Sequence, residues 1–185
     1  MNIFVLDENI DLCARYHCDK HLVKMISEHN QMLGSIGWTS RGIWYKRDMD
    51  RDWINQTFKG FPRSTEEGNP FPYGIGFKHH PCTRWTAHSK ENYEWLCELT
   101  LEMCKEYTRR YGRIHAGEAI LKWYNDNPPP FENSGFTKWV QAMPDECKRD
   151  NPIEGYRKYY LEHKRRFARW AHSETPQWWL ESVEN

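Results

Sequence analysis

The sequence of 185 residues has no excess of either charge and few aliphatic side chains. Lys and Arg total 26, as do Asp and Glu, while Leu, Ile and Val together number only 24. A shortage of aliphatic residues indicates disorder only when the net charge is high, and here it is zero. The 10 Trp, 10 Tyr and 8 Phe residues instead favour a packed core rich in aromatic rings. We expect a single domain over residues 1–185.

No long apolar run is present. The longest early run spans Ile3–Leu6, whereas a helix that crosses a membrane needs about 20 apolar residues. No basic start followed by an apolar stretch marks a secretory signal. We therefore expect a cytoplasmic protein without a membrane partner, whose six Cys residues are reduced thiols.

Several catalytic signatures are also missing. The sequence contains no Gly-x-Ser-x-Gly turn, no Gly-x-x-x-x-Gly-Lys loop, no Cys-x-x-Cys pair and no His-Glu-x-x-His, so no motif supports a serine hydrolase, a P-loop enzyme or a common zinc site. His17 and His21 have the spacing of two metal ligands on a helix, but no zinc motif completes them. The prediction is a protein without a metal or another cofactor.

Hydrophobic spacing predicts an all-α protein. A helical pattern covers residues 9–37, with a break at Cys18-Asp19. The clearest helix covers residues 89–111, with Ser89 as its N-cap and Gly112 as its stop. Further expected elements are a short strand or extended start at 3–6, irregular structure at 38–81, a turn before the helix at 89, a short helix at 117–124, a loop at 131–151, a long helix from Pro152 to about Trp170 and a terminal turn after Pro176.

A row of polar residues follows one side of the first helical region. His17, His21, Lys24 and Glu28 stand at spacings of four, three and four residues, which places them within a few turns of one another. Imidazole, ammonium and carboxylate groups in such a row could transfer protons. They could also form a surface row of weak ion pairs, and the spacing alone favours this second interpretation.

Three segments offer candidate contacts to an anion or a base. Six Lys or Arg and only two Glu give residues 151–172 a net charge of +4, which fits either a solvated helix face or, less simply, an anion-binding surface. His79 and Arg84 could contact a phosphate or a base, or could belong to a solvent-facing turn. Trp178 and Trp179 could anchor the chain end in the core or stack on unpaired bases.

Four blocks of sequence, taken in order, resemble the endonuclease V type of pyrimidine-dimer DNA glycosylase, a small all-helical phage repair enzyme. The blocks are Asp19-Lys-His-Leu22 with Glu28 and Gly34, Lys78-His-His-Pro81 with Trp85, Tyr93-Glu-Trp-Leu96 through Tyr111-Gly112, and Met143-Pro-Asp-Glu-Cys147 followed by a Tyr- and Arg-rich stretch and Pro176-Gln-Trp-Trp179. They span most of the chain, and their order together with the Asp/His/Glu spacing carries the resemblance.

The resemblance implies a helical bundle whose basic concave face kinks DNA and flips out a base. It implies that Glu28 is the catalytic carboxylate, and we assign Asp19, His21 and Lys24 as its near partners, with Lys24 as a fallback amine. The candidate DNA contacts are His79, His80, Arg84, Arg157, Arg165, Arg166, Arg169, Trp178 and Trp179.

The chain also departs from this family. The family's nucleophile is the α-amine of a small residue that removal of Met exposes, but Asn2 is bulky for that removal. We therefore expect Met1 to stay and the amine to be displaced, which counts against strand cleavage through an imine. Long irregular insertions at about 38–78 and 113–140 fit a changed target, such as a modified phage base, or a loss of glycosylase activity.

These observations predict a monomeric DNA-repair enzyme that binds double-stranded DNA and removes a damaged or modified pyrimidine as an N-glycosidase. If a phage encodes it, it acts in the host cytoplasm. Two alternatives stay open. One is a DNA-binding protein without catalytic activity, and the other is an enzyme that hypermodifies a base of phage DNA on the same scaffold.

Overall fold

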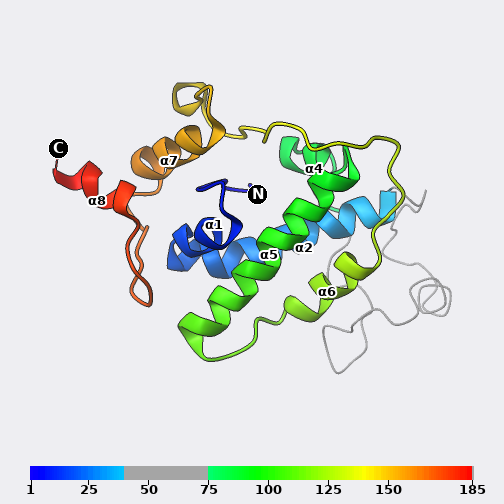
Figure 1. The fold of residues 1–185 in the computed structure, drawn as a ribbon, viewed down its shortest axis with the longest axis horizontal. Helices are drawn as coiled ribbons and strands as arrows, with labels where there is room; N and C mark the ends of the chain where they lie inside the picture. The colour runs from blue at the N-terminus through cyan, green and yellow to red at the C-terminus, as the bar shows by residue number, and fades with distance from the viewer. Residues whose placement is uncertain (40–74, 185) are drawn as a thin grey trace.

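The structure is a computed structural model that describes residues 1–39 and 75–184, and within these ranges every regular element is a helix (Figure 1). The elements are α1 (Ile10–Tyr16), α2 (Asp19–Thr39), α4 (Pro81–Thr86), α5 (Lys90–Tyr111), α6 (Glu118–Asp126), the 3-10 turn η1 (Asp145–Cys147), α7 (Pro152–His163) and α8 (Gln177–Glu184). The all-α prediction is confirmed. Most of the insertion predicted at 38–78 lies outside the described residues.

None of the helices in the described part of the chain is both long and apolar enough to span a bilayer.

The break predicted between the first two helices is confirmed. The side-chain oxygen of Asn9 caps α1 by accepting the backbone N–H of Leu12 at 3.0 Å. His17 then takes an extended conformation and ends α1. α2 follows over 21 residues. Its fully buried apolar side chains are Leu22, Met25, Ile26, Met32 and Leu33.

The long helix α5 crosses the middle of the molecule and packs against α1, α2, α4 and α6 (Figure 1). Ser89 accepts the backbone N–H of Asn92 at 3.3 Å, and Gly112 ends the helix with a φ of 65°, as predicted. A residue with a Cβ would be strained at that φ, which explains a glycine at this stop. The capped helix therefore provides a rigid support for α2.

Three predicted elements are corrected. Pro81–Thr86 forms a helix rather than a turn, because His80 caps it and Pro81 has a preset φ at its first turn. α7 ends at His163 instead of near Trp170. The chain turns there because the Arg169 carbonyl accepts the N–H of Asp19 at 2.8 Å, a long-range contact that sequence periodicity does not encode. The terminal turn after Pro176 is the helix α8.

The first six residues form an extended segment inside the protein. Ile3, Val5 and Leu6 are fully buried, and no strand forms within the described residues. Phe4 has a φ of 27° and its ring stacks on that of His21 at 4.4 Å. An aromatic core therefore encloses the start of the chain and fixes its path.

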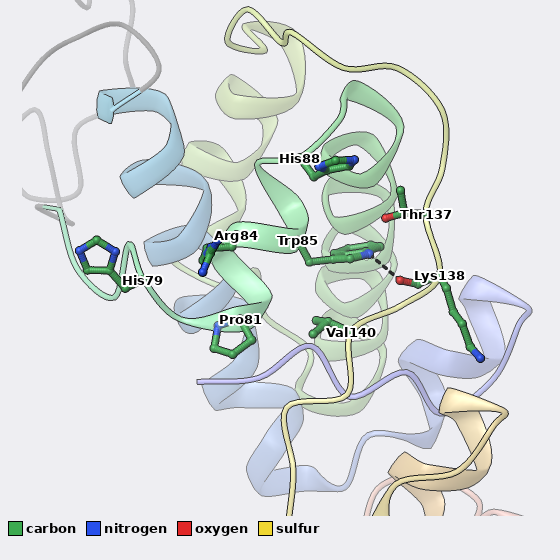
Figure 2. Close-up of a pocket in the computed structure, with 8 residues that line it drawn as sticks. All are labelled: His79, Pro81, Arg84, Trp85, His88, Thr137, Lys138 and Val140. Carbon is green, nitrogen blue, oxygen red and sulfur yellow. Dashed lines mark hydrogen bonds between the residues drawn. The ribbon is translucent and has the colours of Figure 1, made fainter.

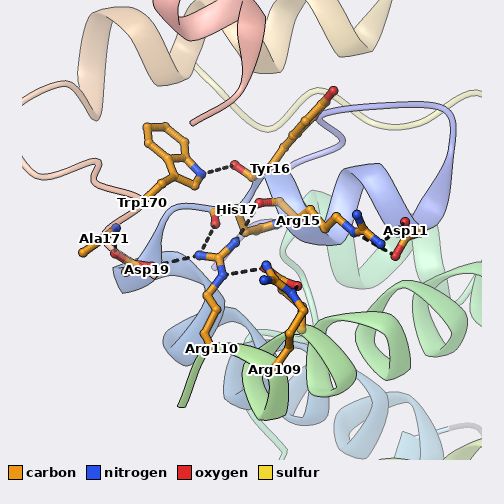
Figure 3. A network of polar contacts seen from close by, with 10 residues as sticks. Asp11, Arg15, Tyr16, His17, Asp19, Arg109, Arg110, Trp170 and Ala171 are labelled. Atoms are coloured by element: carbon orange, nitrogen blue, oxygen red, sulfur yellow. Dashed lines mark hydrogen bonds and ion pairs between the residues drawn. The ribbon is translucent and has the colours of Figure 1, made fainter. Parts of the chain in front are cut away.

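A buried guanidinium joins the end of α5 to the junction of α1 and α2 (Figure 3). Arg110 pairs with Glu106 at 2.6 Å and with Asp19 at 2.9 Å, and it donates to the carbonyl oxygens of Arg15 and His17. Its side chain has no exposed surface. Asp19 also accepts the N–H of Ala171 at 2.7 Å. The role predicted for Asp19, as a partner of Glu28, is therefore corrected: its carboxylate holds three segments of the fold together.

Replacement of Arg110 by Met should lower the free energy of unfolding by about 3–5 kcal/mol, because the substitution removes the buried cation that Glu106, Asp19 and two carbonyl oxygens share. Urea denaturation measures the change. Arg109→Met is the matched control: Arg109 pairs with the same Glu106 but its side chain is 51% exposed, and an exposed pair contributes about 0–1 kcal/mol. Equal losses in the two variants would contradict the role of Arg110.

Candidate active site

The carboxylate of Glu28 lies between two amines. Its Oε1 is 2.8 Å from Nζ of Lys24, one turn earlier on α2, and its Oε2 is 3.3 Å from the α-amino nitrogen of Met1. The Glu28 side chain is 13% exposed, whereas that of Lys24 is 62% exposed. The predicted pairing of Lys24 with Glu28 is thus present, and a second amine that the sequence did not place completes the cluster.

The expectation of a displaced α-amine is wrong. The retained Met1 does not carry the amine away from Glu28, because residues 3–6 run through the core rather than over the surface. This buried path brings the amino nitrogen back beside the third turn of α2. A carboxylate at 3.3 Å can accept a proton from this amine.

His80 lies close enough to this cluster for the charges of Met1 and Glu28 to affect its pKa. Its Nδ1 accepts the N–H of Cys82 at 3.1 Å and so caps α4. Partial burial lowers the pKa of His80, and the positive charge at Met1 lowers it further while Glu28 opposes the shift. Thr83, also on α4, donates to the sulfur of Met1 at 3.7 Å. α4 therefore forms one wall beside the amine.

His21 belongs to the core and not to this cluster. Its ring is stacked on Phe4, and its Nδ1 is 2.5 Å from the hydroxyl of Tyr160. Burial is the main cause that lowers its pKa to about 2, so the imidazole is neutral. The interpretation of His21 as an orienting partner of Glu28 is corrected: the ring instead holds the segment that leads to Met1.

A hollow of about 590 Å³ opens along α4 (Figure 2). It is lined by His79, Pro81, Arg84, Trp85, His88, Thr137, Lys138 and Val140. His79 and Arg84, for which the sequence left both an anion contact and a solvent-facing turn open, thus line the same hollow. Trp85 donates its indole N–H to the carbonyl of Lys138 at 3.0 Å. Lys138 was missed because it comes from a separate segment that only the fold brings beside α4. His88 is local, four positions after Arg84, so helical spacing could have suggested it.

The basic residues of the last third divide into two groups. Arg157 is half-buried and bound within the fold: it donates to the Leu6 carbonyl, pairs with Asp7 at 2.8 Å and lies over the ring of Trp178. These contacts give Arg157 a structural role, and its contact with DNA stays a prediction. Arg165, Arg166 and Arg169 are exposed. Arg165 donates to the Ser182 carbonyl, and Arg169 donates to the carbonyls of Arg165 and Ala168.

The two terminal indoles pack inside the protein. Trp179 is 8% exposed, and its ring centroid is 4.9 Å from that of Trp170. Trp178 is half-buried against Tyr16, Tyr160 and both neighbouring indoles. The anchoring alternative therefore holds for Trp179, and the predicted base stacking by this indole is corrected.

Within residues 1–39 and 75–184, one group has the proximity of metal ligands: Glu146, Cys147 and His163, whose donor atoms lie within 4.8 Å of one another. Ion pairs and a hydrogen bond already account for its arrangement. His163 faces Glu146 at 3.8 Å, and the thiol of Cys147 donates to Glu162 at 3.3 Å. Lys158 pairs in turn with Glu162.

The helical fold and a carboxylate held against an α-amine define the class of protein: an all-α protein that carries the groups for amine and carboxylate chemistry. A family model described as pyrimidine dimer DNA glycosylase matches residues 1–118, a stretch that contains Met1, Lys24, Glu28 and α4. The chain belongs to this family and is a DNA-repair enzyme of the DNA glycosylase class. Neither the curated proteins nor the solved structures contain a match to it.

Three buried histidines should make the protein sensitive to acid. Burial lowers the pKa of His17 to about 4, of His29 to about 3 and of His21 to about 2, against about 6.5 in an unfolded chain. Below pH 6.5 the unfolded state therefore binds protons that the folded state does not. The stability present above pH 6.5 should fall by about 1.4 kcal/mol per pH unit for each histidine as the pH drops toward 4.

Urea denaturation between pH 7.5 and pH 4.5 measures this dependence. His29→Gln should make the slope shallower by the share of one histidine, while His172→Gln, at an exposed position, should leave the slope unchanged. A free energy of unfolding that stays constant from pH 7 to pH 5 would contradict the neutral, buried state of these rings.

Proposed function

We propose that this glycosylase removes a damaged or modified pyrimidine from double-stranded DNA, with Glu28 as the catalytic carboxylate and the α-amine of Met1 as the nucleophile. One observation carries the proposal: the 3.3 Å separation between the amino nitrogen and Oε2 of Glu28. A carboxylate and an amine at this distance can act on the same sugar carbon of a flipped-out nucleotide.

Glu28 stabilises the positive charge that grows on the sugar as the base leaves. This charge exists only near the transition state, so an anion fixed on a packed helix lowers the barrier more than it stabilises bound substrate. The carboxylate is also enclosed, at 13% exposure, and partial exclusion of water strengthens its effect on a nearby charge.

The amine supplies the bond that replaces the glycosidic bond. The neutral amine attacks C1′ of the sugar while the bond from C1′ to the base breaks, and the base leaves with the electron pair of that bond and takes up a proton from water. Glu28, an anion until this point, then accepts a proton from the positively charged nitrogen of the new C–N bond. Glu28 returns this proton to the ring oxygen as the bond from C1′ to that oxygen breaks, which opens the sugar ring and gives a protonated imine between C1′ and the chain. Loss of a C2′ proton from this imine breaks the bond to the 3′ phosphate oxygen, which is the strand-cleavage step.

The hollow along α4 supports the proposal that DNA contacts this helix, which also contacts Met1 through Thr83. Arg84 and Lys138 are exposed cations on its lining, and cations that neutralise phosphates release counterions. Arg166, exposed beyond α7, is a further candidate contact. Binding through these groups should weaken as the salt concentration rises.

Replacement of Glu28 by Gln should lower the rate of base release by about 10²–10³-fold, because the variant loses the anion that faces the developing charge. The assay uses a duplex with one cis-syn pyrimidine dimer, and nucleoside analysis by mass spectrometry reads the product. Glu94→Gln, on the exposed side of α5 with a side chain 52% exposed, removes the same charge and should react like wild type.

The same analysis separates the alternatives. A free base supports the glycosylase, unchanged nucleosides indicate a DNA-binding protein without catalysis, and a heavier nucleoside indicates base modification. Equal base release by wild type and Glu28→Gln would exclude the proposed role of Glu28.

Borohydride reduction during the reaction should trap a covalent complex between protein and DNA through the α-amine of Met1. Peptide mapping of the trapped complex locates the modified amine. Lys24→Met should still be trapped, because the proposed nucleophile is the α-amine of Met1, which contacts a different oxygen of Glu28 from the one that Lys24 contacts. A modified Lys24 peptide, with Met1 unmodified, would show that Lys24 is the nucleophile. Complete base release without any trapped complex would instead indicate hydrolysis by water.

A further inference from the structure

The side chain of Asn2, the residue next to the proposed nucleophile, is buried and hydrogen-bonded at both its nitrogen and its oxygen. Its side-chain Nδ2 donates to the Ala142 carbonyl at 2.7 Å. Its Oδ1 accepts the N–H of Ile3 at 2.9 Å and lies 2.9 Å from the hydroxyl of Tyr156. The residue is only 5% exposed, so these contacts replace water almost completely.

The partners of Asn2 are themselves fixed. Tyr156 is fully buried on α7, and its hydroxyl is also 2.7 Å from the carbonyl of Val140. The thiol of Cys82 on α4 approaches Oδ1 of Asn2 at 3.6 Å. Burial raises the pKa of Cys82 to about 12 and that of Tyr156 well above its usual value, so both groups stay protonated and can donate. We call Asn2, Cys82, Val140, Ala142 and Tyr156 the Asn2 socket.

Any shift of Asn2 passes directly to the amine. Consecutive Cα atoms are about 3.8 Å apart across a rigid peptide unit, so residue 1 has little freedom once residue 2 is fixed. A buried amide that left its partners would cost about 1–3 kcal/mol for each unsatisfied group. The socket therefore confines the amino nitrogen to a narrow region beside Glu28.

The socket uses parts of the chain that lie beyond the family match. Val140, Ala142 and Tyr156 follow residue 118, where the match ends, and Figure 1 shows that the segment before α7 returns across the molecule toward the N-terminus. The last third of the chain thus contacts the first two residues. This contact gives the irregular segment around residue 140 a function at the site.

We propose that Asn2 is the positioning residue of this enzyme, and that its socket holds the amine of Met1 in reach of Glu28 and of the sugar. The proposal rests on the proposed function, because it needs the amine to react. Asn2 itself does not touch the substrate. It acts through the placement of the neighbouring nitrogen, and its size also keeps Met1 in place as the sequence analysis expects.

The test compares Asn2→Leu and Tyr156→Phe with Asn30→Leu, all as full-length chains. Leu is close to Asn in shape, is equally bulky for removal of Met and forms no hydrogen bonds. Asn30 is the matched control, since it is also fully buried and donates one hydrogen bond, to the Gly117 carbonyl at 3.0 Å. Each variant is assayed for borohydride trapping under single turnover, for DNA affinity and for thermal unfolding.

Asn2→Leu should slow trapping by about 100-fold at an unchanged Kd for DNA, because a misplacement of about 1 Å has an effect of this size on reaction rates. Tyr156→Phe, which removes one of the socket's contacts, should slow trapping by about 10-fold. Asn30→Leu should lower the unfolding temperature but leave the trapping rate of the folded protein at the wild-type value. If Asn2 had only a structural role, Asn2→Leu would change the Kd for DNA or the unfolding temperature together with the trapping rate, and the trapping rate of the folded protein would not fall alone.

Two results overturn the proposal in different ways. If wild type is trapped and folded Asn2→Leu is trapped equally fast, or if its rate falls only in proportion to DNA affinity, positioning by Asn2 is wrong and the proposed function stands. If wild type releases the base but is never trapped, the amine is not the nucleophile, and the positioning proposal falls with it.

Discussion

The ion pair between the α-amine of Met1 and Glu28 is the contact on which the site depends, and it imposes a constraint on the whole fold. An amine on the first residue can reach a carboxylate 27 positions later only if the path between them is fixed. The protein meets this constraint by burying residues 3–6 completely, which removes the freedom that a chain terminus normally has. The rings of Phe4, His21 and Tyr160 form the wall of that path.

Polar residues of the core serve the same purpose. His17, His21 and His29 are neutral because burial lowers each pKa, and neutral rings can pack as flat, polar-edged core residues without the cost of a buried charge. Arg110 keeps its charge because carboxylates and carbonyl oxygens surround it. The three histidines pack against the N-terminal segment. Arg110 joins the junction of α1 and α2 to α5.

Much of the helical framework could be predicted because its signals are local. Ser89 and Gly112 bound α5, and the break at Cys18 separates α1 from α2, since caps and stops act within a few residues. The spacing of Lys24 and Glu28 likewise predicts their pairing on one helical turn. The same spacing misplaced His21, because residues on adjacent turns can face the core or the solvent, and only the packing of Phe4 and Tyr160 decides which.

By itself, the sequence determined the all-α class, the bounds of α5, the break between α1 and α2, the pairing of Lys24 with Glu28 and the resemblance to the glycosylase family. Tertiary structure alone decided that the first residue reaches Glu28, that Asn2 is held by Ala142 and Tyr156, that Arg157 pairs with Asp7 and that Trp179 is buried. The physical reason is the range of the contacts. A cap or a helical pair joins residues a few positions apart, whereas the contacts of Asn2 span 140 and 154 positions, and their existence depends on how every helix between them packs.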